Sequence, residues 1–280
     1  MTAQQITLET MMPEHLDGAV ELSRQVGWPH RREDWALVQS LSHGIVALEN
    51  GRVRATILMT PYGDDAATIN MVIVDASMRG RGLGRQLMEE ALAKAGARTC
   101  YLVATPEGLP LYQSLGFVAT GEIARHQGEA LPADAPANVS WSENVSWSEK
   151  GDHSCLVALD RAAYGHDRSA LMQLLQGCAK FAVIREQGSV QTFAAIRAFG
   201  RGLVVGPVVA RNDTEAKAVI KFLLAHQPGK FAVSIPILAQ TSLNGSLVGV
   251  SLTSAAASRC GVPPQLKKTT GPLITGSTRW

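Results

Sequence analysis

The chain has 280 residues, of which 46% are hydrophobic and 18% are charged, and its formal net charge at pH 7 is +2. This composition is typical of folded globular proteins and excludes an intrinsically disordered chain, while the length favours two domains over one. The small net charge and the absence of Lys/Arg-rich blocks argue against a nucleic-acid partner.

The sequence gives no sign of a membrane or metal partner. Its apolar runs stay well short of the roughly 20 residues that a membrane-spanning helix requires. The start, Met1 to Gln5, lacks the basic and apolar regions of a secretory signal, so we expect a cytoplasmic protein. The four cysteines lie far apart without the spacing of a metal site, which predicts reduced thiols and no bound metal.

Residues 1–126 alternate between strand-like and helix-like patterns. The pair Asn50-Gly51 separates two apolar stretches and predicts a hairpin. The predicted strands are Ile6–Met11, Gly44–Leu48, Val53–Thr60, Thr68–Val74, Thr99–Val103 and Phe117–Arg125. The predicted helices follow Pro13, lie near Glu33–Leu41, span Leu83–Ala95 and precede Gly116. Hairpins followed by a crossover predict a mixed α/β domain.

Residues 127–151 have the composition of an interdomain linker, rich in Pro, Ala, Ser and Glu. They contain the hexapeptide Asn-Val-Ser-Trp-Ser-Glu twice, at 138–143 and 144–149. We expect the two tryptophans of this repeat, Trp141 and Trp147, to pack on a domain surface rather than to stack on a ligand.

Residues 152–280 repeat the order of the first half: hairpin, strand, helix, strand. The predicted helices are Asp160–Tyr164, Asp167–Leu175 and Thr214–Ala225, and the predicted strands are Ala179–Arg185, Val190–Phe199, Leu203–Ala210 and Lys230–Ile235. This order suggests two copies of one fold. The tail after residue 236 shows no recognisable closing strand pair, so its fold is left open.

The segment Arg79-Gly-Arg-Gly-Leu-Gly-Arg85 joins the apolar strand ending at Val74 to the helix Leu83–Ala95. Its glycines allow backbone N–H groups to converge at a helix N-terminus, which binds anions, and its three arginines suit phosphate. The segment therefore predicts a diphosphate-bearing ligand. Its spacing fits neither the dinucleotide pattern G-x-G-x-x-G nor a P-loop, which requires Lys-Ser/Thr.

The same segment reads R-x-x-G-x-G and resembles the pyrophosphate loop of the GNAT superfamily of acetyltransferases. Downstream, Leu111-Tyr-Gln-Ser-Leu-Gly-Phe117 resembles that family's motif L-Y-x-x-x-G-F. Stretches that look more narrowly like a bacterial family of tandem GNAT proteins are Gly27–Trp35, Leu102–Tyr112, Ala158–Arg168 and Gly206–Ala210. The resemblance implies tandem GNAT-like domains, each with a mixed, mostly antiparallel twisted sheet flanked by helices.

The resemblance also implies acetyl-CoA as the acyl donor. In the family, the strand before the loop separates from its neighbour, and its backbone binds the pantetheine arm and the acyl carbonyl. Carried onto this chain, the coenzyme-binding residues are Val72, Ile73, Val74, Arg79, Gly80, Arg81, Gly82, Leu83, Gly84 and Arg85. Tyr112 matches the family's tyrosine, which acts as the acid for the leaving thiolate.

The acceptor implied by the resemblance is a primary amine, which we expect to belong to a small molecule. Residues considered for contact with it are Trp28, His30, Glu33 and Asp34 in the first half and Tyr164, His166 and Arg168 in the second. A structural alternative stands beside them, because Glu33 or Asp34 can begin a helix and the tryptophans can lie in the core. The acceptor's identity and the oligomeric state stay open.

Two features limit these expectations. Val103 stands where the tandem family carries aspartate, which leaves the general base open, with His30, Glu33 and Asp34 as candidates that would act through a water molecule. Val103 supports one alternative, a non-catalytic acyl-CoA-binding sensor, and a second alternative is a protein N-acetyltransferase that uses the same coenzyme site with a peptide groove. In the second half, the corresponding loop Arg211-Asn-Asp213 has no glycine. We expect Asn212 or Asp213 to cap the next helix, and this domain not to bind the coenzyme in the usual way.

Overall fold

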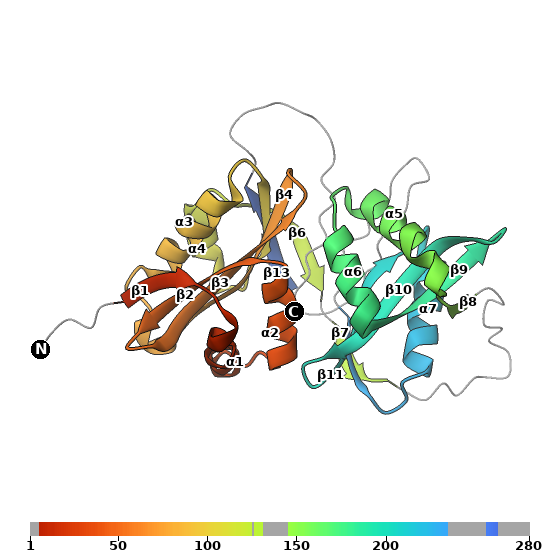
Figure 1. The fold of residues 1–280 in the computed structure, drawn as a ribbon, viewed down its shortest axis with the longest axis horizontal. Coiled ribbons are helices and arrows are strands. Elements are labelled where there is room, and N and C mark those ends of the chain that lie inside the picture. The colour runs from red at the N-terminus through yellow and green to blue at the C-terminus, as the bar shows by residue number, and fades with distance from the viewer. Residues whose placement is uncertain (1–5, 125, 131–144, 235–255, 263–280) are drawn as a thin grey trace, which may run out of the picture. The chain divides into compact units, whose positions relative to one another are not determined.

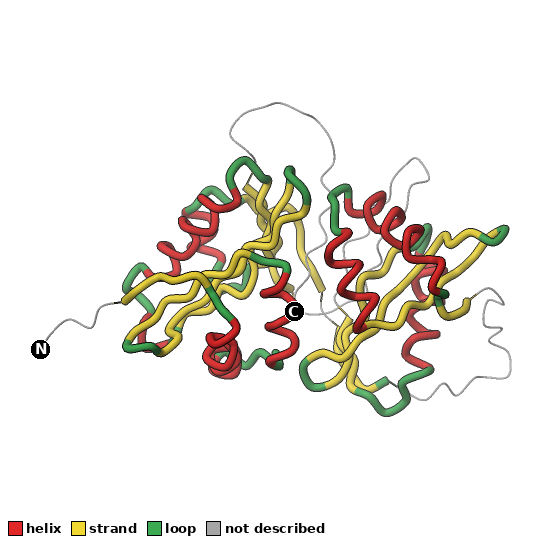
Figure 2. Tube along the Cα trace, viewed as in Figure 1, coloured by secondary structure: helices red, strands yellow, loops and turns green. Residues whose placement is uncertain are grey.

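A computed structural model describes residues 6–124, 126–130, 145–234 and 256–262 (Figure 1). It divides the chain into two compact units whose boundary lies after Thr120, with Ser258 and the residues that follow it to Val262 returning to the first unit. Each unit is a mixed sheet with helices on both faces (Figure 2). The predicted fold class, α/β with two related domains, is confirmed.

The first unit contains a seven-stranded sheet in the order β1-β2-β3-β4-β5-β13-β6. Its strands are β1 (Ile6–Thr10), β2 (His43–Glu49), β3 (Arg52–Tyr62), β4 (Ala66–Val74), β5 (Thr99–Val103), β13 (Ala256–Val262) and β6 (Val118–Ala124). Its helices are α1 (Leu16–Gln25), α2 (Arg32–Ser40), α3 (Leu83–Ala95) and α4 (Leu109–Ser114). Strand β4 runs parallel to β5. Strand β1 pairs with β2, β2 with β3 and β3 with β4, and these three pairs are antiparallel.

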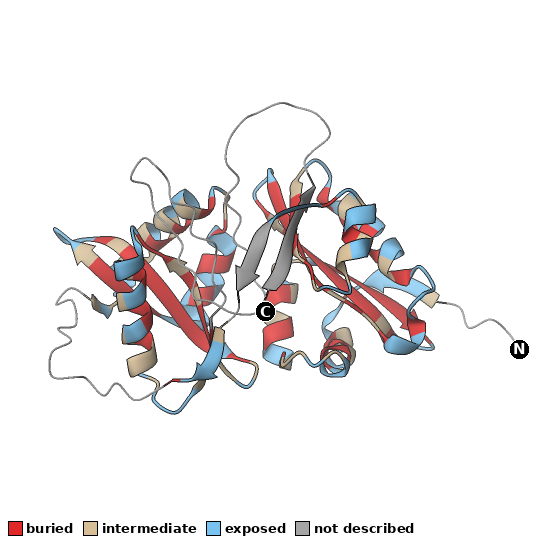
Figure 3. Ribbon diagram, turned by 180° about the vertical axis from the view of Figure 1, so that it is seen from behind, coloured by how far each residue is buried: buried red, intermediate tan, exposed pale blue. Residues whose placement is uncertain are grey.

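Two apolar clusters hold this sheet between its helices. On one face, Leu83, Leu87 and Ala91 of α3 pack against Ile57 and other residues of the central strands. On the other face, α1 and α2 pack against the same strands around the fully buried Trp35. The central strands are therefore buried on both sides, as Figure 3 shows. This burial accounts for their almost uninterrupted apolar sequence.

The connection between β2 and β3 confirms the predicted hairpin. Asn50 and Gly51 both have positive φ, 54° and 73°. A two-residue turn with positive φ at both positions matches the right-handed twist of the strands, and Asn-Gly adopts it with little strain.

Strand β4 contains a β-bulge that was not predicted from the sequence. In its pairing with β3, Thr56 lies opposite Ile73 and Leu58 lies opposite Asn70, so Met71 and the next residue face a single residue of β3. Met71 has a φ of 54°, and the hydroxyl of Thr56 donates a 2.8 Å hydrogen bond to its carbonyl oxygen. The bulge shifts the alternation of side chains along the last part of β4.

The second unit contains a six-stranded sheet in the order β7-β12-β11-β10-β9-β8. Its strands are β7 (His126–Glu129), β12 (Phe231–Ser234), β11 (Gly202–Val209), β10 (Ser189–Phe199), β9 (Ala179–Glu186) and β8 (Val145–Trp147). Its helices are α5 (His153–Tyr164), α6 (Ser169–Cys178) and α7 (Asp213–Ala225). Helix α7 packs on β9, β10 and β11, and β11 runs parallel to β12.

Three strands, β7, β8 and β13, lie in segments where the sequence predicted a linker or left the fold open. Strand β13, from the segment whose fold the sequence left open, pairs with β5 in the first sheet. Strand β7, at the start of the predicted linker 127–151, pairs with β12 in the second sheet. The linker segment also holds β8, where Trp147 packs against Phe222 at a ring-centroid distance of 5.0 Å. Trp141 lies outside the described residues.

Candidate active site

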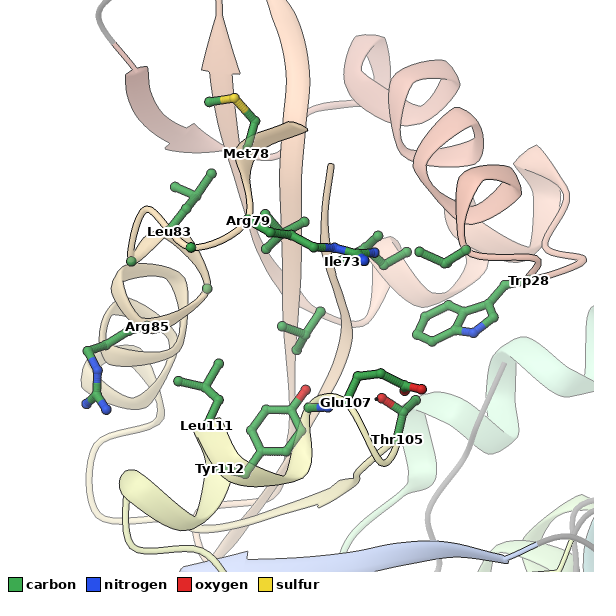
Figure 4. Close-up of a pocket in the computed structure, with 17 residues that line it drawn as sticks. Trp28, Ile73, Met78, Arg79, Leu83, Arg85, Thr105, Glu107, Leu111 and Tyr112 are labelled. Carbon is green, nitrogen blue, oxygen red and sulfur yellow. Dashed lines mark hydrogen bonds between the residues drawn. The ribbon is translucent and has the colours of Figure 1, made fainter. Parts of the chain in front are cut away.

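The first unit contains a cleft of about 710 Å³ at the place where β4 and β5 separate. Their parallel pairing covers only Ala66–Thr68 of β4 and Thr99–Tyr101 of β5. Beyond these residues the strands separate, and the end of β4 borders the cleft. The lining residues are Val26, Trp28, Val72, Ile73, Val74, Met78, Arg79, Gly80, Gly82, Leu83, Gly84, Arg85, Thr105, Glu107, Gly108, Leu111 and Tyr112 (Figure 4).

The last residues of β4 lie directly after the bulge at Met71. Because the pairing with β5 ends at Thr68, the backbone of Val72–Val74 has no strand partner on the cleft side among the strands that the structure describes. An extended stretch of this kind can form backbone hydrogen bonds with an extended ligand that contains amide groups. The separation of these strands, which the resemblance implied, is therefore present in the structure.

The loop after β4 is held at its start by Asp75. The carboxylate of Asp75 accepts hydrogen bonds from the backbone N–H and the hydroxyl of Ser77, at 2.9 and 2.6 Å, and from the guanidinium of Arg54 at 3.2 Å. The hydrogen bonds from Ser77 and the charge of Arg54 lower the pKa of Asp75 against the effect of burial. Asp75 thus fixes the point at which the loop leaves the sheet.

The same loop ends at the N-terminus of α3. Gly80 and Gly82 have φ values of 76° and 78°, which residues other than glycine rarely adopt. Gly82 is the N-cap of α3. The carbonyl of Gly82 accepts hydrogen bonds from the N–H groups of Arg85 and Gln86. The earlier N–H groups of a helix have no partner within it, so they favour an anion at this end of the cleft.

The three arginines of the loop differ in position. Arg79 extends across the cleft, whereas Arg85 points away from it (Figure 4). Arg85 donates a 2.6 Å hydrogen bond to Ser114 and lies 3.7 Å from Glu89. Arg81 is exposed and does not line the cleft. Arg79 is therefore the arginine best placed to contact a ligand in the cleft.

Tyr112 lies opposite the end of β4, on the short helix α4. Its side chain is 7% exposed, its ring meets Phe117 edge to face at 6.1 Å, and its hydroxyl points into the cleft (Figure 4). Gly108, one turn earlier, leaves room for this ring, because a Cβ atom at residue 108 would come within 2.9 Å of it. The structure thus brings Tyr112 together with nine of the ten residues predicted to bind the coenzyme.

Sequence reasoning missed several lining residues between β5 and α4. Thr105 and Glu107 belong to the segment Thr-Pro-Glu-Gly, and Glu107 is exposed to the cleft. Hydrogen bonds from its own backbone N–H and from Thr105, together with the charge of Arg79, lower the pKa of Glu107. A signal was available in the sequence, since a polar stretch directly after a central parallel strand commonly carries function.

The predicted acceptor residues of the first half lie in different places. Trp28 lines the cleft, and it also borders a neighbouring hollow of about 600 Å³ together with His30 and Glu33. His30 is 5% exposed and its ring lies 5.6 Å from that of Trp28. Asp34 is 1% exposed and binds Arg31 at the start of α2, so it has the alternative role of a helix-start residue.

The predicted acceptor residues of the second half have structural contacts within their own unit. Arg168 and Asp160 form two hydrogen bonds of 2.9 and 2.7 Å, and both are almost fully buried. The guanidinium of Arg168 stacks 3.4 Å from the ring centre of Tyr164, which is 4% exposed. This burial corrects the expectation that Tyr164 and Arg168 are available to an acceptor. His166, the third residue considered, is half-buried.

The loop of the second unit that corresponds to Arg79–Arg85 is occupied by the chain's own carboxylates. Arg211 contacts Glu215 at 2.6 Å and also binds Glu186. Although burial opposes it, hydrogen bonds from Arg211 and Thr192 lower the pKa of Glu215. The side chain of Asn212 caps α7 by accepting a 3.0 Å hydrogen bond from the N–H of Glu215, which confirms the predicted N-cap.

Within the described part of the chain, no three or more His, Cys, Asp or Glu side chains are grouped so that they could hold a metal ion. None of the helices in the same ranges combines the length and the apolar sequence needed to cross a membrane.

Comparisons with known proteins match both halves of the chain. Two models described as "Acetyltransferase (GNAT) domain" match residues 40–119 and 156–256, and together they span more than half of the chain. The N-acetyltransferase YitH of Bacillus subtilis, of uncharacterised function, is 29% identical over 247 residues, covering 84% of this chain and 83% of its own.

Two other proteins agree with this assignment. The holothin acyltransferase of Pseudoalteromonas sp. is 26% identical over 196 residues, covering 68% of this chain and 65% of its own. In structure, a tandem GNAT protein from the clavulanic acid biosynthesis pathway has a TM-score of 0.59 at 15% identity, covering 94% of this chain and all of its own. This chain is therefore an acyltransferase of the GNAT superfamily, with two GNAT domains in tandem.

Proposed function

We propose that the first unit transfers an acetyl group from acetyl-CoA to a primary amine of a small molecule. One observation carries the proposal: the end of β4 at Val72–Val74, the glycine-rich loop Arg79–Arg85 and the side chain of Tyr112 border the same cleft. The loop suits a pyrophosphate and the strand end suits the amide-containing pantetheine arm. Acetyl-CoA would supply the activated acyl group as its thioester.

Different residues would have different roles in the transfer reaction. The strand end would orient the thioester, and its backbone N–H groups are suited to stabilise negative charge on the carbonyl oxygen. Tyr112 would donate the proton that the leaving thiolate requires. The amine must be neutral when it attacks, because its lone pair forms the new bond.

The substitution Tyr112→Phe tests the acid directly. We expect kcat to fall by about a hundredfold, because general acid catalysis contributes on that order, while the affinity for acetyl-CoA stays nearly unchanged. CoA release in the presence of a panel of amines is followed with a thiol-detecting dye, and acetyl-CoA binding is measured by calorimetry. Unchanged turnover in the variant would remove Tyr112 from the mechanism.

The same assay separates the proposal from its two alternatives. Binding of acetyl-CoA without CoA release on a broad amine panel would identify a sensor. Val103, the residue that favoured this alternative, is not among the lining residues of the cleft. Acetylated proteins in a lysate treated with the enzyme and acetyl-CoA, detected by mass spectrometry, would identify a protein acetyltransferase. Support for a small acceptor comes from the holothin acyltransferase, whose name specifies one.

A further inference from the structure

The cleft has two chemically different ends. At one end are the N-terminus of α3 and the glycines of the loop, which suit an anion. At the other end, across the strand end of β4, lie Trp28, Thr105 and Glu107 (Figure 4). The first end is assigned to the coenzyme in the proposed function, on which this inference rests. The second end is left for the acceptor.

Glu107 gives the second end its charge. Of the described residues that line the cleft, the charged ones are Arg79, Arg85 and Glu107, and Arg85 is turned toward Ser114. The backbone N–H of Glu107 and the hydroxyl of Thr105 donate hydrogen bonds to the carboxylate and lower its pKa. Arg79 attracts the same carboxylate. Arg79 extends across the cleft (Figure 4), and its turning back to a diphosphate bound at the loop would leave Glu107 as the uncompensated charge.

Trp28 adds an aromatic surface beside this charge. The indole is half-buried at the end of the segment that follows α1, and in Figure 4 it lies on the same side of the cleft as Glu107. A carboxylate and an aromatic ring together favour a cation, because the ring adds a cation–π attraction to the charge–charge attraction. A carboxylate-bearing ligand would instead be repelled.

We propose that Glu107 and Trp28 form the acceptor subsite and select amines of net positive charge over amines that also carry a carboxylate. Glu107 is the specificity-determining residue, since it supplies the negative charge. Trp28 contributes contact area and cation–π attraction. The acceptor class that follows is a small cationic amine, such as an alkyl diamine.

The test compares two sets of acceptors at saturating acetyl-CoA. The cationic set contains 1,4-diaminobutane and agmatine, and the carboxylate-bearing set contains glycine and glutamate. For wild type we expect a higher kcat/KM with the cationic set, and a KM that rises with ionic strength because salt screens the attraction. For Glu107→Gln we expect kcat/KM with the cationic set to fall about tenfold, mainly through KM, and the salt dependence to weaken.

Controls make the outcome specific to the cleft. Glu90→Gln removes the same charge from the exposed face of α3, outside the cleft, and should leave the amine preference unchanged. Glu107→Lys should raise activity with glutamate relative to 1,4-diaminobutane. Both variants at residue 107 should bind acetyl-CoA, because the loop is intact.

The results also separate this inference from the proposed function. If wild type binds acetyl-CoA but acetylates no cationic amine, or prefers the carboxylate-bearing set, the inference is wrong and the coenzyme site stands. The same conclusion follows if Glu107→Gln matches Glu90→Gln in every amine. If wild type does not bind acetyl-CoA, the proposed function fails and the inference fails with it.

Discussion

At the scale of single residues, Gly108 matters because of the side chain that it lacks. A Cβ atom at this position would lie 2.9 Å from Cε2 of Tyr112 and 3.3 Å from its hydroxyl oxygen. The backbone of Gly108 has an ordinary helical conformation, so the backbone itself tolerates any residue. The requirement for glycine therefore comes from the position of the Tyr112 ring.

We predict that Gly108→Ala displaces Tyr112 and lowers kcat by about tenfold or more, because small misplacements of catalytic groups are costly. The effect on acetyl-CoA affinity should be smaller. In the background of Tyr112→Phe, the same substitution should cost little further, since the hydroxyl is already gone. The control is Gly177→Ala, where a Cβ atom meets nothing within 4 Å. Additive losses in the double variant would contradict this role.

The role of the loop Arg79–Arg85 could be predicted from the sequence, because the spacing of its glycines and the charge of its arginines both indicate a site for phosphate. The roles of Glu33 and Asp34 could not be predicted from the sequence in the same way. A carboxylate at a helix start can cap the helix or face a ligand, and only the 2.9 Å contact of Asp34 with Arg31 decides this case. Arg168 and Tyr164 were misjudged for the same reason, since the sequence does not show that Arg168 pairs with the buried Asp160 and stacks on Tyr164.

At the scale of elements, the end of β4 and the start of α3 depend on Asp75. The lowered pKa of this carboxylate means that its charge stabilises the folded state above its unfolded pKa, which is about 3.9. The stabilisation is lost as the pH falls through the folded pKa. Asp75 therefore makes the geometry of the loop sensitive to acid.

We predict that Asp75→Asn lowers the free energy of unfolding of the first unit by about 1 kcal/mol at pH 7, since the amide keeps a hydrogen-bond acceptor but loses the charge beside Arg54. The difference from wild type should shrink toward pH 3. Chemical denaturation at both pH values measures it. Asp64→Asn, whose side chain is fully exposed, is the control. An equal difference at both pH values would show that the charge of Asp75 has no part in it.

The helix Leu83–Ala95 was predicted with the bounds that the structure shows, because its apolar face and its glycine N-terminus are both written in the sequence. The bulge in β4 was not predicted. Met71 is an ordinary buried residue in an apolar run, and its positive φ depends on Thr56 of the neighbouring strand. Contacts between strands of this kind leave no periodic pattern.

At the scale of the whole molecule, the first sheet contains a strand from outside its own continuous segment, whereas the strands of the second sheet, β7 to β12, follow one another in the chain. Strand β13 lies between β5 and β6 in the first sheet, although it follows β12 of the second sheet in the chain. The sequence predicted two related domains in succession, and the positions of β7 and β13 show why their boundaries could not be read from composition. A short strand carries little signal when its partners lie far away.

We predict that Cys260→Pro destabilises the first unit by about 3 kcal/mol or more, because proline removes a ladder hydrogen bond from a strand with neighbours on both sides. Acetyl-CoA should then protect the first unit less well against thermal unfolding. Cys260→Ala keeps the backbone N–H and serves as the control. Equal melting of the two variants would show that β13 contributes little to this sheet.

The position of β13 in the chain also determines when the first sheet can be completed during protein synthesis. The sheet that borders the cleft lacks one of its inner strands until residues 256–262 have been made, and by then every strand of the second sheet is already available. A growing chain thus exposes the unpaired edges of β5 and β6 from the synthesis of β6 until β13 has been made, and such edges invite pairing with other chains. The sheet that borders the cleft is therefore complete only after the strands of both sheets that precede β13 have been synthesised.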